Sequence, residues 1–305
     1  MSISKNFEDA IKVTETSSGN FTANISDNWS IGQTANGGYS MSLLAKACSE
    51  YLDHKDPLVL SANYIDRVEF GPANIEVSKI ASTKSTSIED TKVSLKLLEN
   101  DQDFFITTCG IHPHYADIFE ESNIREIKEL SEHPSVKAIG ETGLDFNRNY
   151  SKKDNQILCF KSQIEVAQDL NLPLFLHQRD AHKDFMNCFS NIDLKVNAVV
   201  HCFTGEKEEF YEYLDKGFWI GFTGWICDPV RGKHMIDLIA NMPLERIMIE
   251  TDSPYLLPKN LKIKGRRNEP KFIVEVAKKI AKLQNKDLEE ITQIFFENSQ
   301  KFFNL

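Results

Sequence analysis

Five short apolar segments of this chain each run directly into a polar motif, and this pattern constrains the fold more than any other feature. The motifs occupy Ile111–His114, Gly140–Phe146, Leu176–Asp180, Val200–Gly205 and Ile249–Tyr255. Each apolar segment is rich in β-branched or aromatic residues, which is typical of a buried parallel strand. The motifs place five metal-binding or proton-transferring side chains at the predicted strand ends: His112, Glu141, His177, His201 and Asp252. The pattern predicts a parallel β/α barrel with these groups gathered at the carboxyl ends of its strands.

The spacing of the motifs supports six repeating strand–helix units. Glu141, His177 and His201 follow one another at intervals close to the roughly 30 residues of one βαβ step. The predicted strands are residues 104–110, 136–140, 172–176, 196–200, 218–222 and 247–249. Helices are expected after most of them, at 155–170, from 181 onward and at 207–216, and two amphipathic helices are expected over 272–305.

The first 80 residues follow a different pattern. We expect strands at 21–25, 58–65 and 73–80, a turn over Asn36–Tyr39 and a helix over Ser40–Tyr51. The stretch of small polar residues Ala81–Ser87 is the expected boundary between the two parts of the chain. The chain therefore divides, on this interpretation, into residues 1–80 and residues 81–305.

Composition narrows the class of protein. The chain has 305 residues, 41% of them hydrophobic, and a net charge of −10. No apolar run approaches the ~18 residues that span a membrane, and the N-terminus lacks the apolar core of a signal peptide. Six cysteines without paired spacing suit a reducing cytoplasm. We therefore expect a cytoplasmic protein with no membrane partner and no obligate protein partner. The acidic charge argues against a protein that coats DNA, but not against a nuclease.

The donor atoms of the motifs favour a divalent metal. Two histidines and two carboxylates at four strand ends offer mixed nitrogen and oxygen ligands, which suit Zn²⁺, Mn²⁺ or Fe²⁺, with Mg²⁺ possible where phosphate and water complete the shell. A buried Glu141 without a partner would cost several kcal/mol. A bound cation would remove that cost.

Residues from about 82 to 305 resemble the TatD family of metal-dependent deoxyribonucleases, which have a TIM barrel fold. The matching motifs occur in order and are GIHPH, AIGETGLDFNRN, LFLHQRDAH, HCFTG, GFTGWICD, IETDSPYLLP and RRNEP. The resemblance implies hydrolysis of DNA phosphodiesters by metal-activated water, with Mg²⁺, Mn²⁺ or Zn²⁺ as the cofactor. It implies metal ligands at Glu141, His177 and His201, with Asp252 as a further ligand or as the catalytic proton acceptor.

The same resemblance implies residues that contact the substrate. His112 and His114 would lie at the rim of the site, near the scissile phosphate. Arg179 and Arg267 are candidates for phosphate contacts, and a surface or helix-end role is equally open for each.

The chain departs from the family at its start, where no Asp-x-His-x-His occurs. Residues 1–80 instead resemble the N-terminal half of a hotdog-fold acyl-CoA thioesterase-like protein, through Phe21–Ala23, Trp29–Gly32, Asn36–Tyr39 and Gly71–Ala73. We expect a barrel without its usual first strand behind an α+β hotdog-like fragment, although residues 73–82 could serve as the second barrel strand. Alternative functions are a catalytically impaired fusion protein, an acyl-CoA thioesterase, and a barrel that cleaves C–N bonds.

Overall fold

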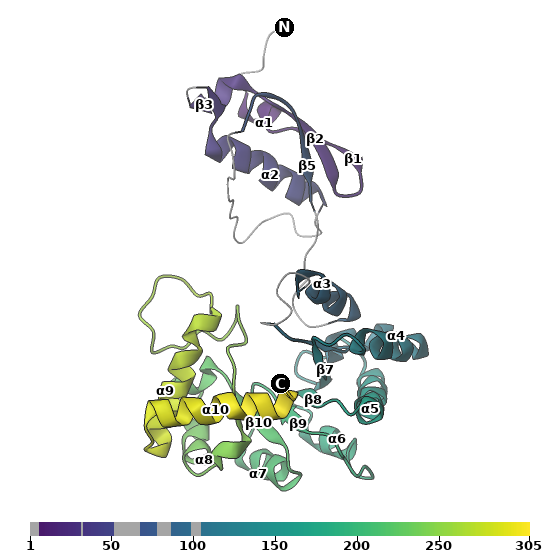
Figure 1. The fold of residues 1–305 in the computed structure, drawn as a ribbon, viewed down its shortest axis with the longest axis vertical. Helices are drawn as coiled ribbons and strands as arrows, with labels where there is room; N and C mark the ends of the chain where they lie inside the picture. Colours follow the sequence, from purple (N-terminus) through teal and green to yellow (C-terminus); the bar gives the residue numbers. More distant parts are fainter. Residues whose placement is uncertain (1–5, 32, 52–67, 78–86, 99–104) are drawn as a thin grey trace. The chain divides into compact units, whose positions relative to one another are not determined.

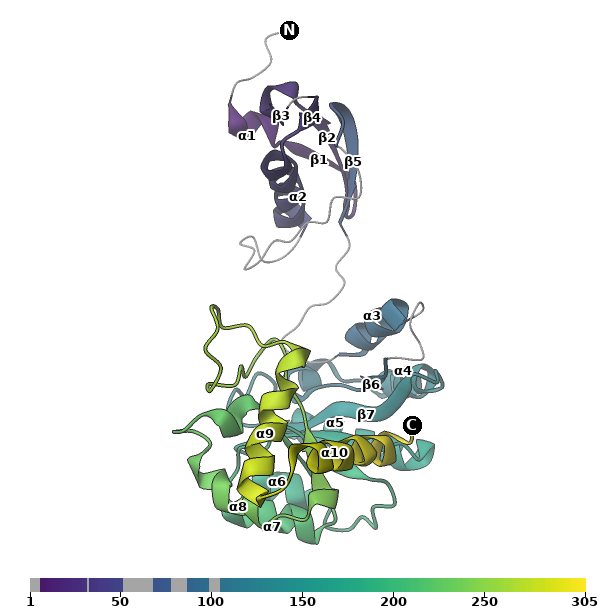
Figure 2. The ribbon, with the colours of Figure 1, turned by 60° about the vertical axis from the view of Figure 1, so that its left-hand side comes forward.

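The structure, a computed structural model, describes residues 6–31, 33–51, 68–77, 87–98 and 105–305. The chain divides into two compact units, residues 1–82 and residues 83–305. Figures 1 and 2 show the elements of each unit.

The first unit holds a three-stranded antiparallel sheet and a helix packed on one face of it. The sheet has the order β1-β2-β5, and its strands are Val13–Ser17, Asn20–Ile25 and Gly71–Glu76. Along β2 the exposed and buried residues alternate strictly, as predicted for 21–25. The buried side chains Ala23 and Ile25 pack with Tyr39 and Leu43 of helix α2 (Gly37–Tyr51). Helix α1 (Phe7–Ala10) and the short strands β3 (Ser30–Ile31) and β4 (Thr34–Ala35) complete the unit.

Two predictions for this unit need correction. Helix α2 begins at Gly37 rather than Ser40, because the Asn36 side chain accepts a hydrogen bond from the Gly38 amide (2.8 Å) and caps the first turn. Residues 73–76 form a strand as predicted, but they do not serve as a barrel strand, because β5 pairs antiparallel with β2 (Ala23 opposite Ala73). The predicted strand at 58–65 lies outside the described residues.

The second unit is built on a six-stranded parallel sheet with the order β11-β10-β9-β8-β7-β6. In chain order its strands β6 to β11 are Thr107–Cys109, Val136–Asp145, Leu174–Arg179, Ala198–Val200, Trp219–Phe222 and Ile247–Ile249. Consecutive strands are neighbours throughout, as in a β/α barrel, whereas a doubly wound sheet reverses its order partway. Among the described residues, no strand ahead of β6 joins this sheet, as expected for a barrel without its first strand.

Helices connect the strands and cover the sheet. Helices α3 to α8 are Ile88–Leu98, Glu121–Ser131, Lys153–Leu170, His182–Asn187, Lys207–Asp215 and Ile236–Ala240. The predicted tail helices are confirmed as α9 (Ile273–Gln284) and α10 (Leu288–Phe303), which lie beside each other in Figure 1. Within the part of the chain that the structure describes, no helix is both long and apolar enough to span a bilayer.

Two strands extend further than their sequences predict, and this places functional residues within the sheet. β7 continues from Gly140 to Asp145, and β8 continues to Arg179. The extension depends on Gly143, which lies opposite His177 at a φ of +146°. A Cβ at this position would lie 1.9 Å from the His177 carbonyl oxygen, so only glycine lets the two strands approach this closely.

Candidate metal centre

The predicted metal-binding side chains come together at the carboxyl ends of the parallel strands. Glu141 and His177 lie on β7 and β8, and His201 directly follows β9. Asp252 follows β11 and lines the same cavity as these three residues. The strand–helix pattern of the sequence therefore predicted which of these side chains lie close together.

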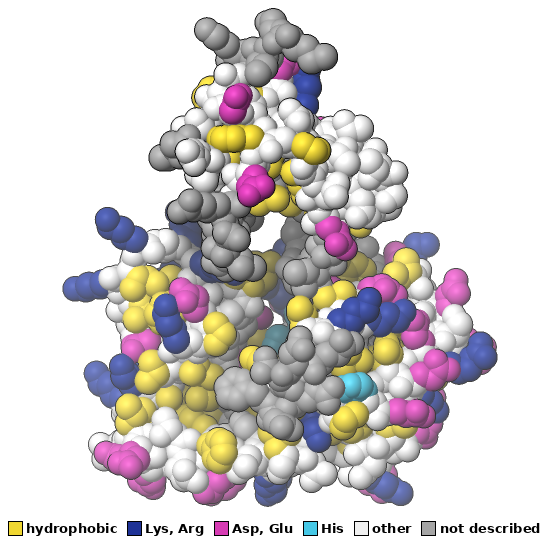
Figure 3. All heavy atoms as spheres, turned by 45° about the horizontal axis from the view of Figure 1, so that its top comes forward, with side chains coloured by type: hydrophobic (Ala, Val, Ile, Leu, Met, Phe, Trp, Pro, Cys, Tyr) yellow, Lys and Arg dark blue, Asp and Glu magenta, His cyan; other side chains and the backbone are white. Residues whose placement is uncertain are grey.

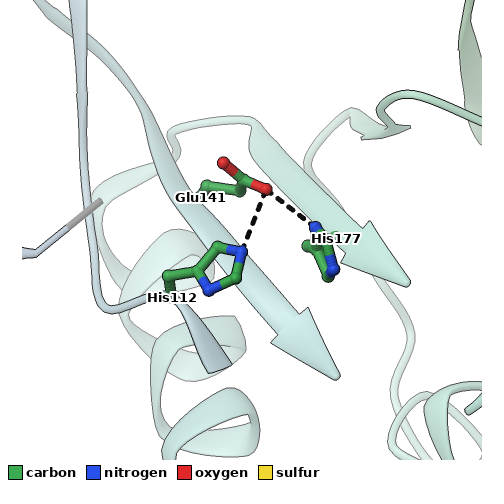
Figure 4. A group of neighbouring side chains, drawn as sticks. All are labelled: His112, Glu141 and His177. Carbon is green, nitrogen blue, oxygen red and sulfur yellow. Dashed lines mark hydrogen bonds and ion pairs between the residues drawn. The ribbon is translucent and has the colours of Figure 1, made fainter. Parts of the chain in front are cut away.

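A β-bulge aims Glu141 into the site. The register between β7 and β8 shifts between Gly140 and Thr142, which leaves Glu141 as the extra residue. Bulges of this kind re-aim a side chain and are common beside active sites. Figure 4 shows the Glu141 carboxylate pointing between the rings of His112 and His177.

One oxygen of Glu141 is the centre of the cluster. Its Oε1 lies 2.6 Å from His201 Nε2, 2.8 Å from His177 Nδ1 and 3.3 Å from His112 Nε2. His177 Nδ1 and His201 Nε2 are 3.4 Å apart. Two ligands that each lie about 2.0–2.1 Å from a tetrahedral Zn²⁺ are separated by roughly 3.3 Å, so this spacing suits a shared cation.

Electrostatic coupling within the cluster is strong. Burial would raise the pKa of Glu141, but the charges of His201 and His112 hold it well below its usual value. Burial would lower the pKa of His201, yet Glu141 and Glu250 raise it well above the usual range. The partly buried carboxylate is therefore stabilised by positive charge beside it, which a divalent cation would also provide.

The histidines also present nitrogen atoms at a spacing that suits a metal. The buried His177 Nε2 faces Asp145 Oδ2 (3.4 Å), which leaves His177 Nδ1 facing Glu141 in the cluster. The group His112, Glu141 and His177 offers three ligand atoms that all lie within 4.8 Å of one another. Nitrogen and carboxylate ligands of this kind suit Zn²⁺ or Mn²⁺. The residues therefore fit the cofactor that the sequence motifs imply.

His112 lies deeper than the sequence predicts. The motifs place it at the rim, but it is 3% exposed and contacts Glu141. Burial lowers the pKa of His112 to about 4, so its ring is neutral near pH 7 and can act as a ligand. His112 is buried because it directly follows the buried segment that begins at the end of β6 and includes Cys109 and Ile111.

Asp145 is a site residue that the sequence motifs did not single out. It is 1% exposed, and its Oδ2 lies 2.9 Å from His114 Nε2 and 3.4 Å from His177 Nε2. Burial would raise the pKa of Asp145, but the interactions with these two histidines outweigh burial and lower it. Its position in the Gly-Leu-Asp-Phe motif, at the end of a strand that already carries Glu141, was an available signal.

Glu250 was missed as well, although it directly follows β11. Its Oε2 lies 3.4 Å from His201 Nδ1, and its Oε1 accepts the Cys202 backbone N–H (2.5 Å). A carboxylate on the far nitrogen of a ligating histidine fixes the orientation and tautomer of that ring. Glu250 is therefore placed to position His201.

The remaining predicted residues occupy different surroundings. His114 and Arg179 line the cavity of about 430 Å³ that contains Glu141, His177, His201 and Asp252. Arg267 is exposed and does not line this cavity, so its contact with phosphate stays a prediction. Burial raises the pKa of Asp252 to about 6.

A parallel β/α barrel with histidines and carboxylates at its strand ends defines a class of metal-dependent hydrolases. The chain belongs to the family described as TatD related DNase, whose model matches residues 68–304. The fold class and the family expected from the motifs are thereby confirmed.

Individual relatives support the same membership. The chain is 40% identical to a protein named 3'-5' ssDNA/RNA exonuclease TatD from Musicola paradisiaca, over 72% of this chain and 84% of that protein. It is 42% identical to the protein of the same name from Rahnella sp., over 72% of this chain and 85% of that protein. A solved TatD homologue from Escherichia coli K12 matches with a TM-score of 0.65 and 28% identity, over 72% of this chain and 85% of that one. A TatD family hydrolase from Entamoeba histolytica has the same TM-score and identity, over 72% of this chain and 82% of that one.

The N-terminal segment matches a second family. Residues 25–105 match the model described as acyl-CoA thioesterase N-terminal domain. This agrees with the hotdog-like resemblance expected from the sequence.

Proposed function

We propose that this chain is a metal-dependent nuclease that hydrolyses phosphodiester bonds of DNA. The observation that carries the proposal is the cluster of Glu141, His177 and His201 around one carboxylate oxygen, in a chain of the TatD family. Phosphodiesters resist attack because their negative charge repels hydroxide. A bound divalent cation would polarise the phosphoryl oxygen and lower the pKa of a bound water toward 7.

The residues of the chain supply the remaining parts of the reaction. Glu141, His177 and His201 would hold the cation, and His112 is placed to join them. Asp252 is the proposed proton acceptor for the attacking water. A carboxyl group whose pKa is about 6 is ionised near neutral pH, yet it is more basic than an ordinary aspartate.

Neighbouring side chains would position these groups and the substrate. Glu250 and Asp145 orient the histidine rings through the contacts described above. Arg179, which lines the cavity, is placed to contact a phosphate oxygen, whereas Arg267 would reach substrate only outside the cavity. Mg²⁺, Mn²⁺ and Zn²⁺ all remain candidates, because the donors combine imidazole with carboxylate.

The names of the relatives narrow the proposed substrate. Both bacterial relatives are named as 3'-5' exonucleases of single-stranded DNA and RNA. We extend this to the chain and propose that it acts on single strands. With a net charge of −10, the chain must bind such a substrate through a local set of cations rather than through its overall field.

The test combines metal content with nuclease activity of the purified full-length chain. His177→Ala and His201→Ala should lose bound metal and hydrolysis together, because each removes a ligand. His234→Ala is the matched control, because His234 is exposed and lies outside the cluster. Chelation should abolish hydrolysis by the wild type, and added Mg²⁺, Mn²⁺ or Zn²⁺ should restore it. Full activity in excess chelator would refute the proposal.

The same assay decides between this function and the alternatives. A wild-type chain that binds metal but cleaves no nucleic acid would favour a catalytically impaired fusion protein. Hydrolysis of an acyl-CoA that survives in His201→Ala would favour a thioesterase of the N-terminal segment.

A further inference from the structure

Three cavities of the second unit adjoin one another and share two side chains. The cavity of the metal centre, about 430 Å³, is lined in part by Trp225 and Arg231. The same two residues line a second cavity of about 450 Å³ and a third of about 360 Å³. The second and third cavities therefore meet the metal-centre cavity at Trp225 and Arg231. We call these two cavities the branches of the site.

The two branches differ in charge. The second cavity is lined by Lys259 and Arg266, and its acidic residue, Asp228, already binds the Lys259 ammonium at 2.8 Å. The third cavity carries three acidic side chains, Asp180, Glu206 and Glu209, beside Arg179 and the shared Arg231. A polyanion would therefore be attracted more strongly to the second cavity, which we call the basic branch, than to the third, which we call the acidic branch.

The basic branch is lined mainly by one loop, whose composition is unusual. Residues 253–268, between β11 and α9, contain five Lys or Arg and no Asp or Glu, although the chain as a whole has a net charge of −10. The five cations are all exposed: Lys259, Lys262, Lys264, Arg266 and Arg267. Figure 3 shows Lys and Arg side chains projecting from the left flank of the larger unit, where this loop lies in Figure 1.

Trp225 and Arg231 form a platform at the branch point. The Arg231 guanidinium carbon lies 5.1 Å from the centre of the Trp225 ring. Its side chain is 60% exposed, and its Nε is 4.0 Å from Asp228, beyond hydrogen-bond range. Asp228 instead accepts the backbone N–H groups of Val230 (2.9 Å) and Arg231 (3.1 Å), which hold this turn in place. The guanidinium thus keeps its donors available beside a flat apolar surface.

We propose that this basic branch, defined by Trp225, Arg231 and the 256–266 loop, binds the nucleotides next to the scissile phosphodiester of a single-stranded nucleic acid. The inference rests on the proposed nuclease function. The sugar–phosphate backbone follows the loop cations, and a base stacks on the Trp225–Arg231 platform. Aromatic and arginine platforms bind unpaired bases of any sequence, and a cationic groove follows the backbone. The apolar side chains of Leu261 and Ile263 line the same branch.

The experiment compares a short single-stranded oligonucleotide, as DNA and as RNA, with the small diester bis-p-nitrophenyl phosphate. The variants are Arg231→Ala and Arg266→Ala, and the control is Arg125→Ala, an exposed arginine of α4. In the first two variants KM for the oligonucleotides should rise on the order of 10-fold. The slope of log KM against log salt should fall by about 0.7 for each phosphate that the protein no longer neutralises. Hydrolysis of the small diester, which reaches only the metal centre, should be unchanged in Arg266→Ala, because Arg266 does not line the metal-centre cavity.

Binding without turnover separates this inference from the nuclease proposal. With metal chelated, fluorescence anisotropy of the labelled oligonucleotides should show weaker binding to Arg231→Ala and Arg266→Ala than to Arg125→Ala. Unchanged Kd values in both variants would overturn the inference, whether or not the chain cleaves nucleic acid.

Discussion

A single buried carboxamide connects the segment that carries His112 to the rest of the barrel. Gln163 of α5 is fully buried and accepts the Ile111 backbone N–H at 2.7 Å. Its amide nitrogen lies 3.0 Å from the Ile111 carbonyl oxygen and 2.7 Å from Thr142 Oγ1 of β7. Replacement of Gln163 by leucine keeps the approximate volume and removes these three hydrogen bonds, together with the longer contacts of its amide nitrogen to Cys159 of the same helix.

The magnitude follows from this geometry. Each net hydrogen bond contributes about 1 kcal/mol, and a buried donor left unpaired, here the Ile111 N–H, costs a further ~1–3 kcal/mol. Gln163→Leu should therefore lower the free energy of unfolding of the second unit by about 4–6 kcal/mol. At ~2–4 °C per kcal/mol for a domain of this size, its melting temperature should fall by about 10–20 °C.

Differential scanning calorimetry of the full chain measures this shift as a change in the transition of the second unit. Gln293→Leu is the matched control, because Gln293 is exposed on α10 and bonds only to the neighbouring Glu297 (2.8 Å). That change should stay within about 0.5 kcal/mol of the wild type. If the two variants melt together, the Gln163 carboxamide does not hold the His112 segment, and our account of how that segment is positioned is wrong.

Three further predictions concern charged groups. Asp252→Asn keeps the shape but loses the basicity, so metal should partly remain while turnover falls roughly 10²-fold; wild-type turnover would remove Asp252 from the mechanism. Glu250→Gln should weaken metal affinity by about 10- to 100-fold, as measured by metal titration, because His201 loses the carboxylate that orients it, and unchanged affinity would contradict this. The hydrogen bond from Lys259 lowers the pKa of Asp228 to about 2, so the stabilisation is present above the unfolded pKa of about 4 and is lost as the pH falls through 2. Asp228→Asn should accordingly be less stable than the wild type at neutral pH, and urea unfolding should show this difference vanishing near pH 2.

The sequence by itself determined the class of fold and which side chains meet at the carboxyl ends of the strands. Buried apolar segments followed at regular spacing by polar motifs leave few arrangements other than parallel strands whose carboxyl ends meet. That order is enough to bring Glu141, His177 and His201 to one edge of the sheet. The same motifs identified the family, and the pattern around Phe21 and Gly37 identified the hotdog-like segment.

The tertiary structure decided how each side chain is used. The alternation of side chains along a strand does not reveal a bulge, because the position of the extra residue depends on the register with the neighbouring strand. The bulge between β7 and β8 is what directs Glu141 into the site. His112 is buried against Glu141, whereas Arg267 is exposed and lies outside the cavity. The sequence motifs that contain these two residues gave no sign of this difference. Arg231 carries no sequence signal of its own. Its place above Trp225 depends on the turn that Asp228 holds through the Val230 and Arg231 N–H groups. It depends also on Lys259, which is distant in the sequence and pairs with Asp228.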